Sequence, residues 1–531
     1  MAGMPKQRKR AKYTRSKSGC RVCRIRKVKC DQTRPACIKC TSTGRECEGY
    51  PLVTATTPNS VAHMLLPRTL SPFPGTNPLE ERSFSYFKTR TIPQFSAPYG
   101  SDFWSRLVLQ VGDREPSVRH ALVALGALHE DFEAQALMNS VKRSESVSLR
   151  RFAGIYYSKA LSVLSVYIGD HSWEGLVVSL TCCIICIGFE WLRGGMAAAL
   201  SHLRGALRIL SQWYHGHIEG LYNRLGTSPS SPNGHLIRSQ IVPVMMRLAI
   251  TARTAVSELP HVQWRNVTVD VLAPGGDQST SMQDARFAFE VILSDAYLQP
   301  ETQSLSNGHG PYILTKVCRD AFSDALDQWY KTYSVCLYED SEAICEGEKP
   351  QLERLSLTIR YLTVLIMLRT SHTKDQTAHD SYIPQFTRIV HLSSLILNHD
   401  NIVAHTGPVS TPSRAPTFMP RFRIDMDAVP MLYFTATKCR HPLIRRKAAA
   451  LLRTRGSREG FWDGYAEARL ADEVIFIEEE GLGKITDETC IPAERRVYML
   501  DEEIDLETKT LRMRFARQDV EEMGEWRVLK W

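Results

Sequence analysis

The chain has 531 residues, of which 43% are hydrophobic. It is too long for one ordinary domain, and it has enough apolar residues for a large buried core. The net charge of +9 is concentrated at one end, because residues 1–50 hold 15 Lys and Arg against 3 Asp and Glu, while residues 51–531 hold 51 against 54. We therefore expect a polyanionic partner for the first 50 residues and exclude one for the rest.

Residues 1–19 are predicted to form a disordered basic arm. The basic run from Lys6 to Lys12 is typical of a nuclear import signal. The arm has no apolar stretch of the kind that a secretory signal requires. We therefore expect a nuclear protein whose cysteines stay reduced.

Six cysteines follow, and they repeat one spacing unit, C-x2-C-x6-C, twice. Zinc prefers four tetrahedral ligands, so two zinc ions need eight ligand positions. Six thiolates supply eight positions if two of them bridge both ions, and the repeat nominates the first cysteine of each half, Cys20 and Cys37. The predicted cofactor is therefore two zinc ions per chain. The six predicted ligands are Cys20, Cys23, Cys30, Cys37, Cys40 and Cys47.

The spacing argues against three other uses of these cysteines. One zinc ion would leave two of the six sulfurs unused. Three disulfides would need a secreted protein, and the N-terminal arm does not indicate one. An iron–sulfur cluster is disfavoured because its cysteines are spaced differently. The spacing therefore favours a two-zinc cluster.

The basic residues are unevenly distributed between the two halves of the repeat. Five of the eight non-cysteine positions between residues 20 and 30 are Arg or Lys, whereas residues 37–47 hold only Lys39 and Arg45, with Glu46 against them. Two zinc ions and six thiolates carry a charge of about −2, which offsets part of the basic charge. The surplus predicts contact with a polyanion, and double-stranded DNA is the expected partner.

The segment from Cys20 to Cys47, with its C-x2-C-R-x-R-K-x-K-C core and Pro35 between the halves, resembles the fungal binuclear zinc-cluster transcription factors. The resemblance implies a DNA-binding domain over residues 20–50, whose first short helix enters the major groove at a C-G-G half-site. It implies that Lys27 contacts the guanines with help from Arg26. Arg24 and Lys29 would contact phosphates, which position the protein without reading sequence.

Residues 51–79 are predicted to be a flexible linker rich in Pro, Thr and Ser. Many members of the family carry a dimerising coiled coil after the zinc cluster, and that needs apolar heptads over several turns. No such heptads occur between Tyr50 and Glu80. We therefore expect residues 1–80 to be monomeric, and any homodimer to form through the remainder of the chain.

Residues 80–531 show helical periodicity and predict a large all-α domain. Glu115-Pro116 is expected to begin one helix, and residues 152–167 continue the same period. The apolar stretch 176–189 is too short for a membrane span and predicts a buried helix over 176–192, paired with a second helix after Gly194-Gly195. Strand-like alternation is confined to short pieces such as 508–515. Further helices are expected at 238–257, 283–298, 317–334, 353–371, 383–398, 427–453 and 460–480.

Two segments of this region are similar to the fungal transcription factor regulatory domain. They are residues 84–130, which include the run from Arg119 to Glu130, and the run from Leu432 to Arg440. The resemblance implies an all-helical domain that senses effectors, restrains activity and contacts other transcriptional regulators. No residue is assigned to any of these roles.

The sequence therefore predicts a transcription factor for RNA polymerase II and not an enzyme. Residues 481–486 lack the spacing of a phosphate-binding loop, and His120 and His129 are expected to be structural. Two alternatives stay open. One is a pathway-specific regulator of a metabolic or secondary-metabolite gene cluster. The other is an interaction scaffold whose zinc cluster only supports folding.

Overall fold

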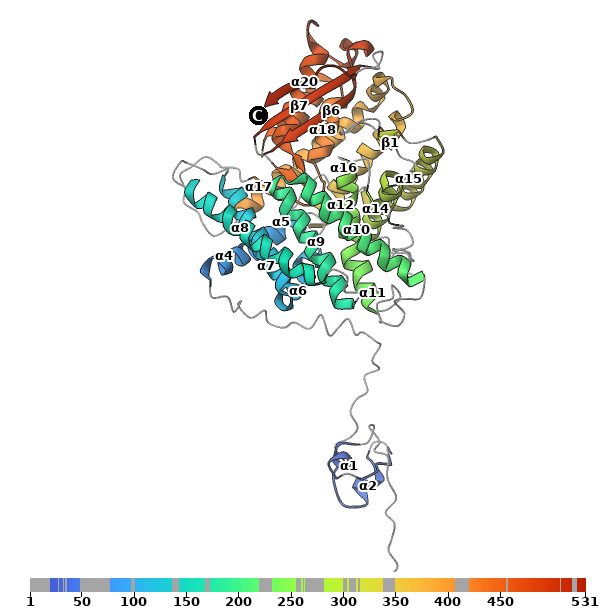
Figure 1. Cartoon of the computed structure of the whole chain (residues 1–531). Coiled ribbons are helices and arrows are strands. Elements are labelled where there is room, and N and C mark those ends of the chain that lie inside the picture. The colour runs from blue at the N-terminus through green and yellow to red at the C-terminus, as the bar shows by residue number, and fades with distance from the viewer. Residues whose placement is uncertain are drawn as a thin grey trace, which may run out of the picture. The chain divides into compact units, whose positions relative to one another are not determined.

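The computed structural model describes most of the chain, in two compact units that fall within residues 1–66 and 67–531 (Figure 1). The basic arm at 1–19 and residues 51–76 of the expected linker lie outside the described residues. The described residues are 20–26, 28–31, 33, 36–47, 77–96, 101–135, 143–167, 172–218, 232–254, 259–260, 262, 281–298, 303–304, 312–313, 316–337, 349–405, 420–454, 457–506, 508–517 and 523–531.

The first unit contains two short helices, one in each half of the cysteine repeat. Helix α1 spans Arg21–Ile25 and helix α2 spans Ile38–Thr41. Cys37 is the N-cap residue of α2, in an extended conformation. Helices of four or five residues are not stable alone in water, so these two depend on the contacts between the halves.

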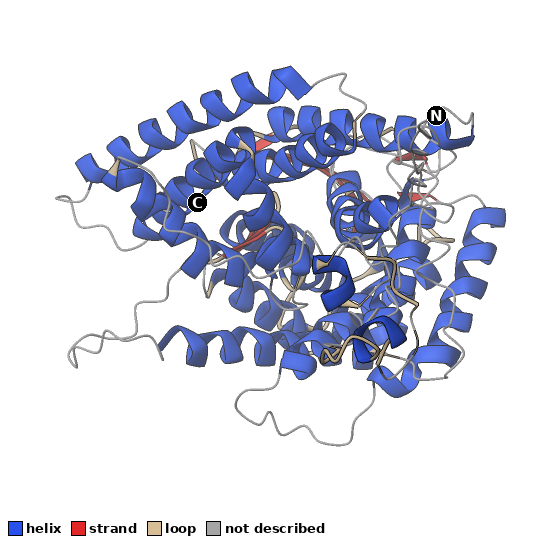
Figure 2. Cartoon of the chain, turned by 90° about the horizontal axis from the view of Figure 1, so that it is seen from below, coloured by secondary structure: helices blue, strands red, loops and turns tan. Residues whose placement is uncertain are grey.

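The second unit is predominantly helical, as the sequence predicts (Figure 2). Five-residue π-helical segments lead directly into α-helices at three places in the described residues, η1 Phe87–Thr91, η2 Phe103–Leu107 and η6 Ile237–Ile241. The α-helices are α4 Pro78–Tyr86, α5 Ile92–Ser96, α6 Val108–Arg114, α7 Pro116–Gln135, α8 Arg143–Leu164, α9 Trp173–Arg193, α10 Met196–Ile218, α11 Pro232–Leu236, α12 Val242–Arg253, α14 Met282–Leu298, α15 Lys316–Leu337, α16 Lys349–Thr370, α17 Ile383–His405, α18 Val429–Lys438, α19 Pro442–Arg453 and α20 Gly464–Glu479. Short 3₁₀ segments are η4 Ser165–Tyr167, η7 Gln376–Tyr382, η8 Glu488–Cys490 and η9 Ala493–Arg495.

Helices α7 and α9 form the centre of the N-terminal part, where α7 packs against α4, α8 and α9. Gly126 permits the crossing of α7 and α4, because a Cβ atom there would lie 2.1 Å from the carbonyl oxygen of Ser83. The predicted hairpin after α9 is confirmed. Gly194 ends α9 with a φ of 90°, a conformation that glycine adopts without steric cost, and α10 then packs back on α9.

Helix α9 is long and apolar enough to span a membrane by length and composition. Its most apolar stretch is nevertheless completely buried inside the domain. Cys182, Cys183 and Cys186 lie in this helix as buried free thiols. The burial agrees with the prediction of a core helix in which these cysteines serve as small apolar residues.

The C-terminal region departs from a purely helical domain. Strands β6 Val497–Asp505, β7 Thr510–Arg517 and β8 Arg527–Lys530 form an antiparallel sheet in that order. The alternation at 508–515 predicted one of them, but β6 is rich in Asp and Glu and lacks an alternating pattern. Its register places Asp501 opposite Arg514, and the two side chains form an ion pair at 2.8 Å. Cross-strand pairing of this kind is a non-local contact that periodicity does not reveal.

Five shorter strands form the remaining two sheets of the described residues. Strands β1 Gln303–Ser304 and β2 Tyr312–Ile313 pair with each other, and β4 Arg458–Glu459 pairs with both β3 Phe422–Arg423 and β5 Trp462–Asp463.

The helix expected at 427–453 is divided into α18 and α19. His441 is extended, and Pro442 occupies the first turn of α19. A residue before proline avoids the helical conformation, which explains the break. The later helix expected at 460–480 begins at Gly464, because the Asp463 side chain accepts hydrogen bonds from the backbone N–H groups of Tyr465 and Ala466.

Candidate metal centre and nucleic-acid interface

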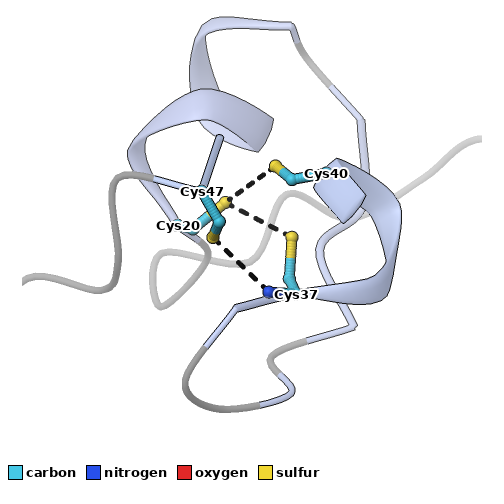
Figure 3. Close-up of side chains that lie close together, drawn as sticks. All are labelled: Cys20, Cys37, Cys40 and Cys47. Atoms are coloured by element: carbon cyan, nitrogen blue, oxygen red, sulfur yellow. Dashed lines mark hydrogen bonds between the residues drawn. The ribbon is translucent and has the colours of Figure 1, made fainter. Parts of the chain in front are cut away.

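All six predicted zinc ligands lie together in the first unit. Cys23 and Cys40 belong to α1 and α2, and the other four flank these helices. Five of the six are buried, and Cys47 is half-buried. All six are free thiols. The structure therefore gathers the six sulfurs into one cluster, in which no disulfide framework is formed. Figure 3 shows four of them, Cys20, Cys37, Cys40 and Cys47.

The six sulfur atoms form two overlapping sets of four. Within each set, the sulfurs lie within 4.8 Å of one another. Both sets include Cys20 and Cys37, whose sulfurs are 3.6 Å apart. This is the pair that the sequence repeat nominates as bridging ligands. One set is Cys20, Cys23, Cys30 and Cys37, and the other is Cys20, Cys37, Cys40 and Cys47.

The separations of the sulfurs suit tetrahedral zinc. Cys20 Sγ lies 3.7 Å from Cys40 Sγ, and Cys23 Sγ lies 3.6 Å from Cys37 Sγ. A zinc–thiolate bond of about 2.3 Å gives a tetrahedron whose sulfurs are about 3.8 Å apart. The donors therefore fit zinc both in chemistry and in spacing.

The two halves hold their sulfurs by the same backbone contact. The N–H group of Cys20 donates to Cys30 Sγ at 3.5 Å, and the N–H group of Cys37 donates to Cys47 Sγ at 3.4 Å. Such N–H donors orient a metal-bound thiolate and stabilise its negative charge. The repeat in the sequence is thus also a repeat in the hydrogen bonding.

Asp31 supports the second half, although it was not among the predicted site residues. Its carboxylate accepts hydrogen bonds from the Thr33 hydroxyl and from the backbone N–H groups of Ile38, at 2.9 Å, and Lys39, at 3.1 Å. These bonds, with the one from Thr33 first, hold the pKa of Asp31 well below its usual range. The sequence signal for this role is the aspartate directly after Cys30, whose short side chain accepts hydrogen bonds from the backbone at the start of α2.

Arg26 connects the two halves of the cluster. Its Nη1 donates to the carbonyl oxygen of Lys39 at 3.3 Å and to Thr43 Oγ1 at 3.2 Å. Both acceptors lie at the C-terminal end of α2 or just beyond it. In this conformation the guanidinium serves the cluster itself, and the predicted contact of Arg26 with a base edge stays a prediction.

The other predicted DNA contacts are described to different extents. Lys29 is exposed, and the backbone of Arg24 lies in α1. Lys27 lies outside the described residues. The side chain of Ile25 is 69% exposed. The first half therefore presents at least one cation on an open surface next to α1.

In the second unit, the segment that resembles the regulatory domain contains a buried polar network. His129 is fully buried, and its Nδ1 lies 2.9 Å from Thr91 Oγ1. Burial lowers the pKa of His129 to about 4. Glu133, one helical turn later, pairs with Arg90 at 3.0 Å. These contacts join η1 to α7, which confirms a structural role for His129.

A second buried network surrounds Glu478 near the C-terminal sheet. One carboxylate oxygen accepts from Arg440 Nη2 at 2.8 Å and from the Val497 N–H at 2.8 Å, and the other accepts from Arg445 Nη2 at 2.7 Å. Burial by itself would raise the pKa of Glu478, but the two arginines outweigh it and lower that pKa to about 2. The network fixes α18, α19, α20 and β6 together.

Two family models match the chain. The fungal Zn(2)-Cys(6) binuclear cluster domain matches residues 18–55, and the fungal specific transcription factor domain matches residues 82–330. No solved structure matches the chain.

Several curated relatives are transcription regulators. The chain is 30% identical over 225 residues to the aspercryptin biosynthesis cluster-specific transcription regulator atnN of Emericella nidulans. The aligned region covers 37% of this chain and 35% of the relative. It is 31% identical over 205 residues to the transcription regulator lscL of Purpureocillium lilacinum. Here the aligned region covers 36% of this chain and 48% of the relative. The chain thus spans between a third and a half of the length of these relatives.

The matched families and relatives are transcription factors and not enzymes, in agreement with the expectation from the sequence. The binuclear cluster domain binds two zinc ions, and the six clustered sulfurs supply their ligands. The zinc-binding motif, the helical second unit and the relatives agree: the chain carries the binuclear cluster domain of the fungal Zn(2)-Cys(6) transcription regulators, followed by a fungal specific transcription factor domain.

Proposed function

We propose that this chain is a nuclear, sequence-specific regulator of RNA polymerase II transcription that binds C-G-G half-sites. The observation that carries the proposal is the pair of four-sulfur sets sharing Cys20 and Cys37, built directly onto the basic helix α1. Zinc bound there would hold α1 in a fixed orientation, since so small a unit has little core of its own. The helix could then enter a major groove as a rigid element.

In this proposal, Cys20 and Cys37 bridge the two zinc ions. Their sulfur separation of 3.6 Å supports the assignment, because bridging sulfurs form the edge that two tetrahedra share. The remaining four cysteines would each bind one ion. Zinc supplies the folding energy of the unit and neutralises most of the thiolate charge.

The basic residues of the first half have separate roles in DNA binding. Lys27 would contact guanine in the major groove, and Arg26 would assist it after exchanging its bonds to α2 for the base edge. Arg24 and Lys29 would contact phosphates, and the exposure of Lys29 supports that role.

The proposal is tested by binding of the zinc-loaded full chain to a short duplex with one C-G-G element, in competition with a scrambled duplex of equal length. Preferential retention of the C-G-G duplex at about 150 mM salt is expected, with loss of retention after chelation of zinc. Equal binding of both duplexes would instead favour the interaction scaffold.

A second, narrower function is regulation of a biosynthetic gene cluster. The relative from Emericella nidulans is named as a cluster-specific regulator, and that name motivates the proposal. Deletion of the gene in its host should lower or raise the transcripts of a contiguous set of genes. Scattered changes with no contiguous set would contradict this function.

Any homodimer of this chain, and its contacts with other transcriptional regulators, are expected to form through the helical domain. The full chain and a chain that lacks residues 1–66 should then sediment as the same oligomer. A dimer formed only by the full chain would place the pairing element in the first 66 residues.

A further inference from the structure

The helical domain contains a cavity whose residues have no functional role assigned above. Its volume is about 210 Å³, and its wall combines side chains from α12, α14, α16, α18, η7 and β6. Most of the lining is apolar, and it includes Met367, Met431, Phe434 and Trp462. A concave apolar site with few polar groups is the usual form of a small-molecule site.

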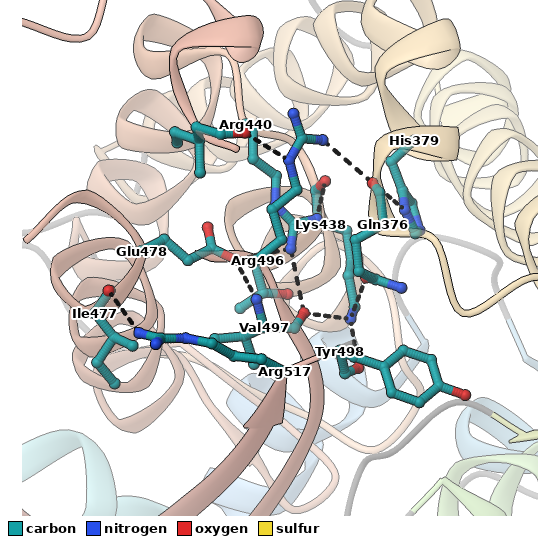
Figure 4. A network of polar contacts seen from close by, with 12 residues as sticks. Gln376, His379, Lys438, Arg440, Ile477, Glu478, Arg496, Val497, Tyr498 and Arg517 are labelled. Carbon is teal, nitrogen blue, oxygen red and sulfur yellow. Dashed lines mark hydrogen bonds and ion pairs between the residues drawn. The ribbon is translucent and has the colours of Figure 1, made fainter. Parts of the chain in front are cut away.

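One of the polar groups in the wall is the ammonium group of Lys438, at the C-terminal end of α18. It donates to Gln376 Oε1 at 3.1 Å, to the Tyr498 carbonyl at 3.1 Å and to the Val497 carbonyl at 3.5 Å (Figure 4). All three acceptors are uncharged. Among the described residues, no carboxylate accepts a hydrogen bond from this lysine. Burial, with the nearby Arg440, lowers the pKa of Lys438 to about 7.

Two carboxylates of the surrounding elements are paired with arginines, and Glu502 accepts a hydrogen bond at 3.2 Å from the hydroxyl of Tyr433, which also lines the cavity. Glu478 accepts from both Arg440 and Arg445, and Asp380 pairs with Arg496 at 2.7 Å. None of these carboxylates accepts a hydrogen bond from Lys438, whose three acceptors are uncharged. A buried cation without a counterion is unfavourable, and an anion that enters the cavity would relieve this.

We propose that this cavity binds an apolar monocarboxylate, with its carboxylate against Lys438 and Gln376 and its hydrocarbon part among the methionine and aromatic side chains. The carboxylate would supply the counterion that Lys438 lacks and would accept a charge-assisted hydrogen bond. The three N–H groups of Lys438 already donate to Gln376, Val497 and Tyr498, so the ligand carboxylate would replace Gln376 Oε1 as one acceptor. The Gln376 amide would then turn its Nε2, which donates to the Lys374 carbonyl at 3.2 Å, toward the second oxygen.

The volume sets the size of the ligand. An apolar cavity of about 150 Å³ holds one benzene molecule. About 210 Å³ therefore accommodates an aromatic ring with a short chain, or an aliphatic acid of similar volume. Binding would couple α16, α18 and β6, since all three contribute to the wall.

The proposal is tested with 4-phenylbutyrate and its neutral analogue 4-phenylbutanamide, by isothermal titration of the full chain at about pH 6. Near this pH the acid is ionised and Lys438 is largely protonated. Saturable binding of the acid is expected, with an affinity at least about tenfold higher than that of the amide. Lys438→Met should abolish that preference, because it removes the charge and keeps the length of the side chain. Sodium acetate should not compete, since it lacks the apolar part.

Two further variants complete the test. Lys447→Met removes an exposed lysine of α19 and should bind the acid as the wild type does. Val364→Phe fills the cavity from α16 and should weaken the binding of acid and amide alike. This variant tests the location of the site even if Lys438→Met fails to fold. Equal affinity for acid and amide, an unchanged affinity in Lys438→Met or Val364→Phe, or no saturable binding by the wild type would each overturn the proposal.

Discussion

The guanidinium of Arg26 donates a hydrogen bond to the carbonyl oxygen of Lys39 at 3.3 Å, so a basic residue of the first half-repeat is attached to the helix of the second half. A second bond joins the same guanidinium to the Thr43 hydroxyl. Arg26 therefore has a structural role in the cluster in addition to the base contact expected from the family resemblance.

We predict that Arg26→Ala loosens the zinc cluster by about 1–2 kcal/mol, since each lost hydrogen bond contributes about 0.5–1.5 kcal/mol. The measurement is the rate of zinc transfer from the full chain to a chromogenic chelator. Lys29→Ala is the matched control, because Lys29 is exposed and its removal should leave the rate unchanged. Identical rates for wild type and Arg26→Ala would show that the bridge between the halves contributes nothing.

The bridging assignment predicts how cysteine variants lose metal. Native mass spectrometry of the wild-type chain should show two zinc ions. Cys37→Ala should disrupt both sites, whereas Cys47→Ala should affect mainly one, because Cys47 belongs to only one of the two sulfur sets.

Cys490→Ala serves as the control for those variants, since Cys490 is a half-buried free thiol of the second unit and should leave both ions bound. Retention of one tightly bound zinc ion by Cys37→Ala would contradict the bridging role.

Base and phosphate contacts should respond differently to mutation. Lys27→Ala is expected to lower affinity for a C-G-G duplex by about 1–3 kcal/mol and to remove the preference over a scrambled duplex. Arg24→Ala should weaken both duplexes alike and reduce the slope of log K against log salt by about 1. Fluorescence anisotropy titrations at several salt concentrations measure both effects. An unchanged preference in Lys27→Ala would refute its contact with guanine.

The network around Glu478 predicts a dependence of stability on pH. The pKa of Glu478 is lowered to about 2 in the folded chain, below the value of about 4.5 expected after unfolding. Its contribution is therefore present above about pH 4.5 and is lost as the pH falls toward 2. Glu478→Gln should destabilise the domain by about 3–5 kcal/mol near neutral pH, because it leaves two buried arginines without their shared anion.

Denaturant unfolding of the two chains between pH 7 and pH 3 measures this difference, which should shrink toward the acid end. Glu480→Gln is the control, because Glu480 is exposed and only two residues away. A difference that stays constant across the pH range would indicate that Glu478 acts through packing and not through its charge.

Local sequence patterns were sufficient to predict the zinc cluster and the helical class of the second unit. The cysteines lie within 28 residues of one another, so their spacing alone restricts which sulfurs can share an ion. The helices α9 and α10 are marked by an apolar period and by Gly194 between them, which are local signals as well.

Contacts between residues that are distant in the chain became visible only in the folded structure. Nothing near Glu478 in the sequence indicates that Arg440 and Arg445 share its carboxylate, and nothing near Lys438 indicates a cavity wall completed by Gln376 and by the β6 backbone. The strand pairing of β6 with β7 is also non-local. Such contacts depend on how whole elements pack, whereas periodicity and spacing report only what a residue shares with its near neighbours.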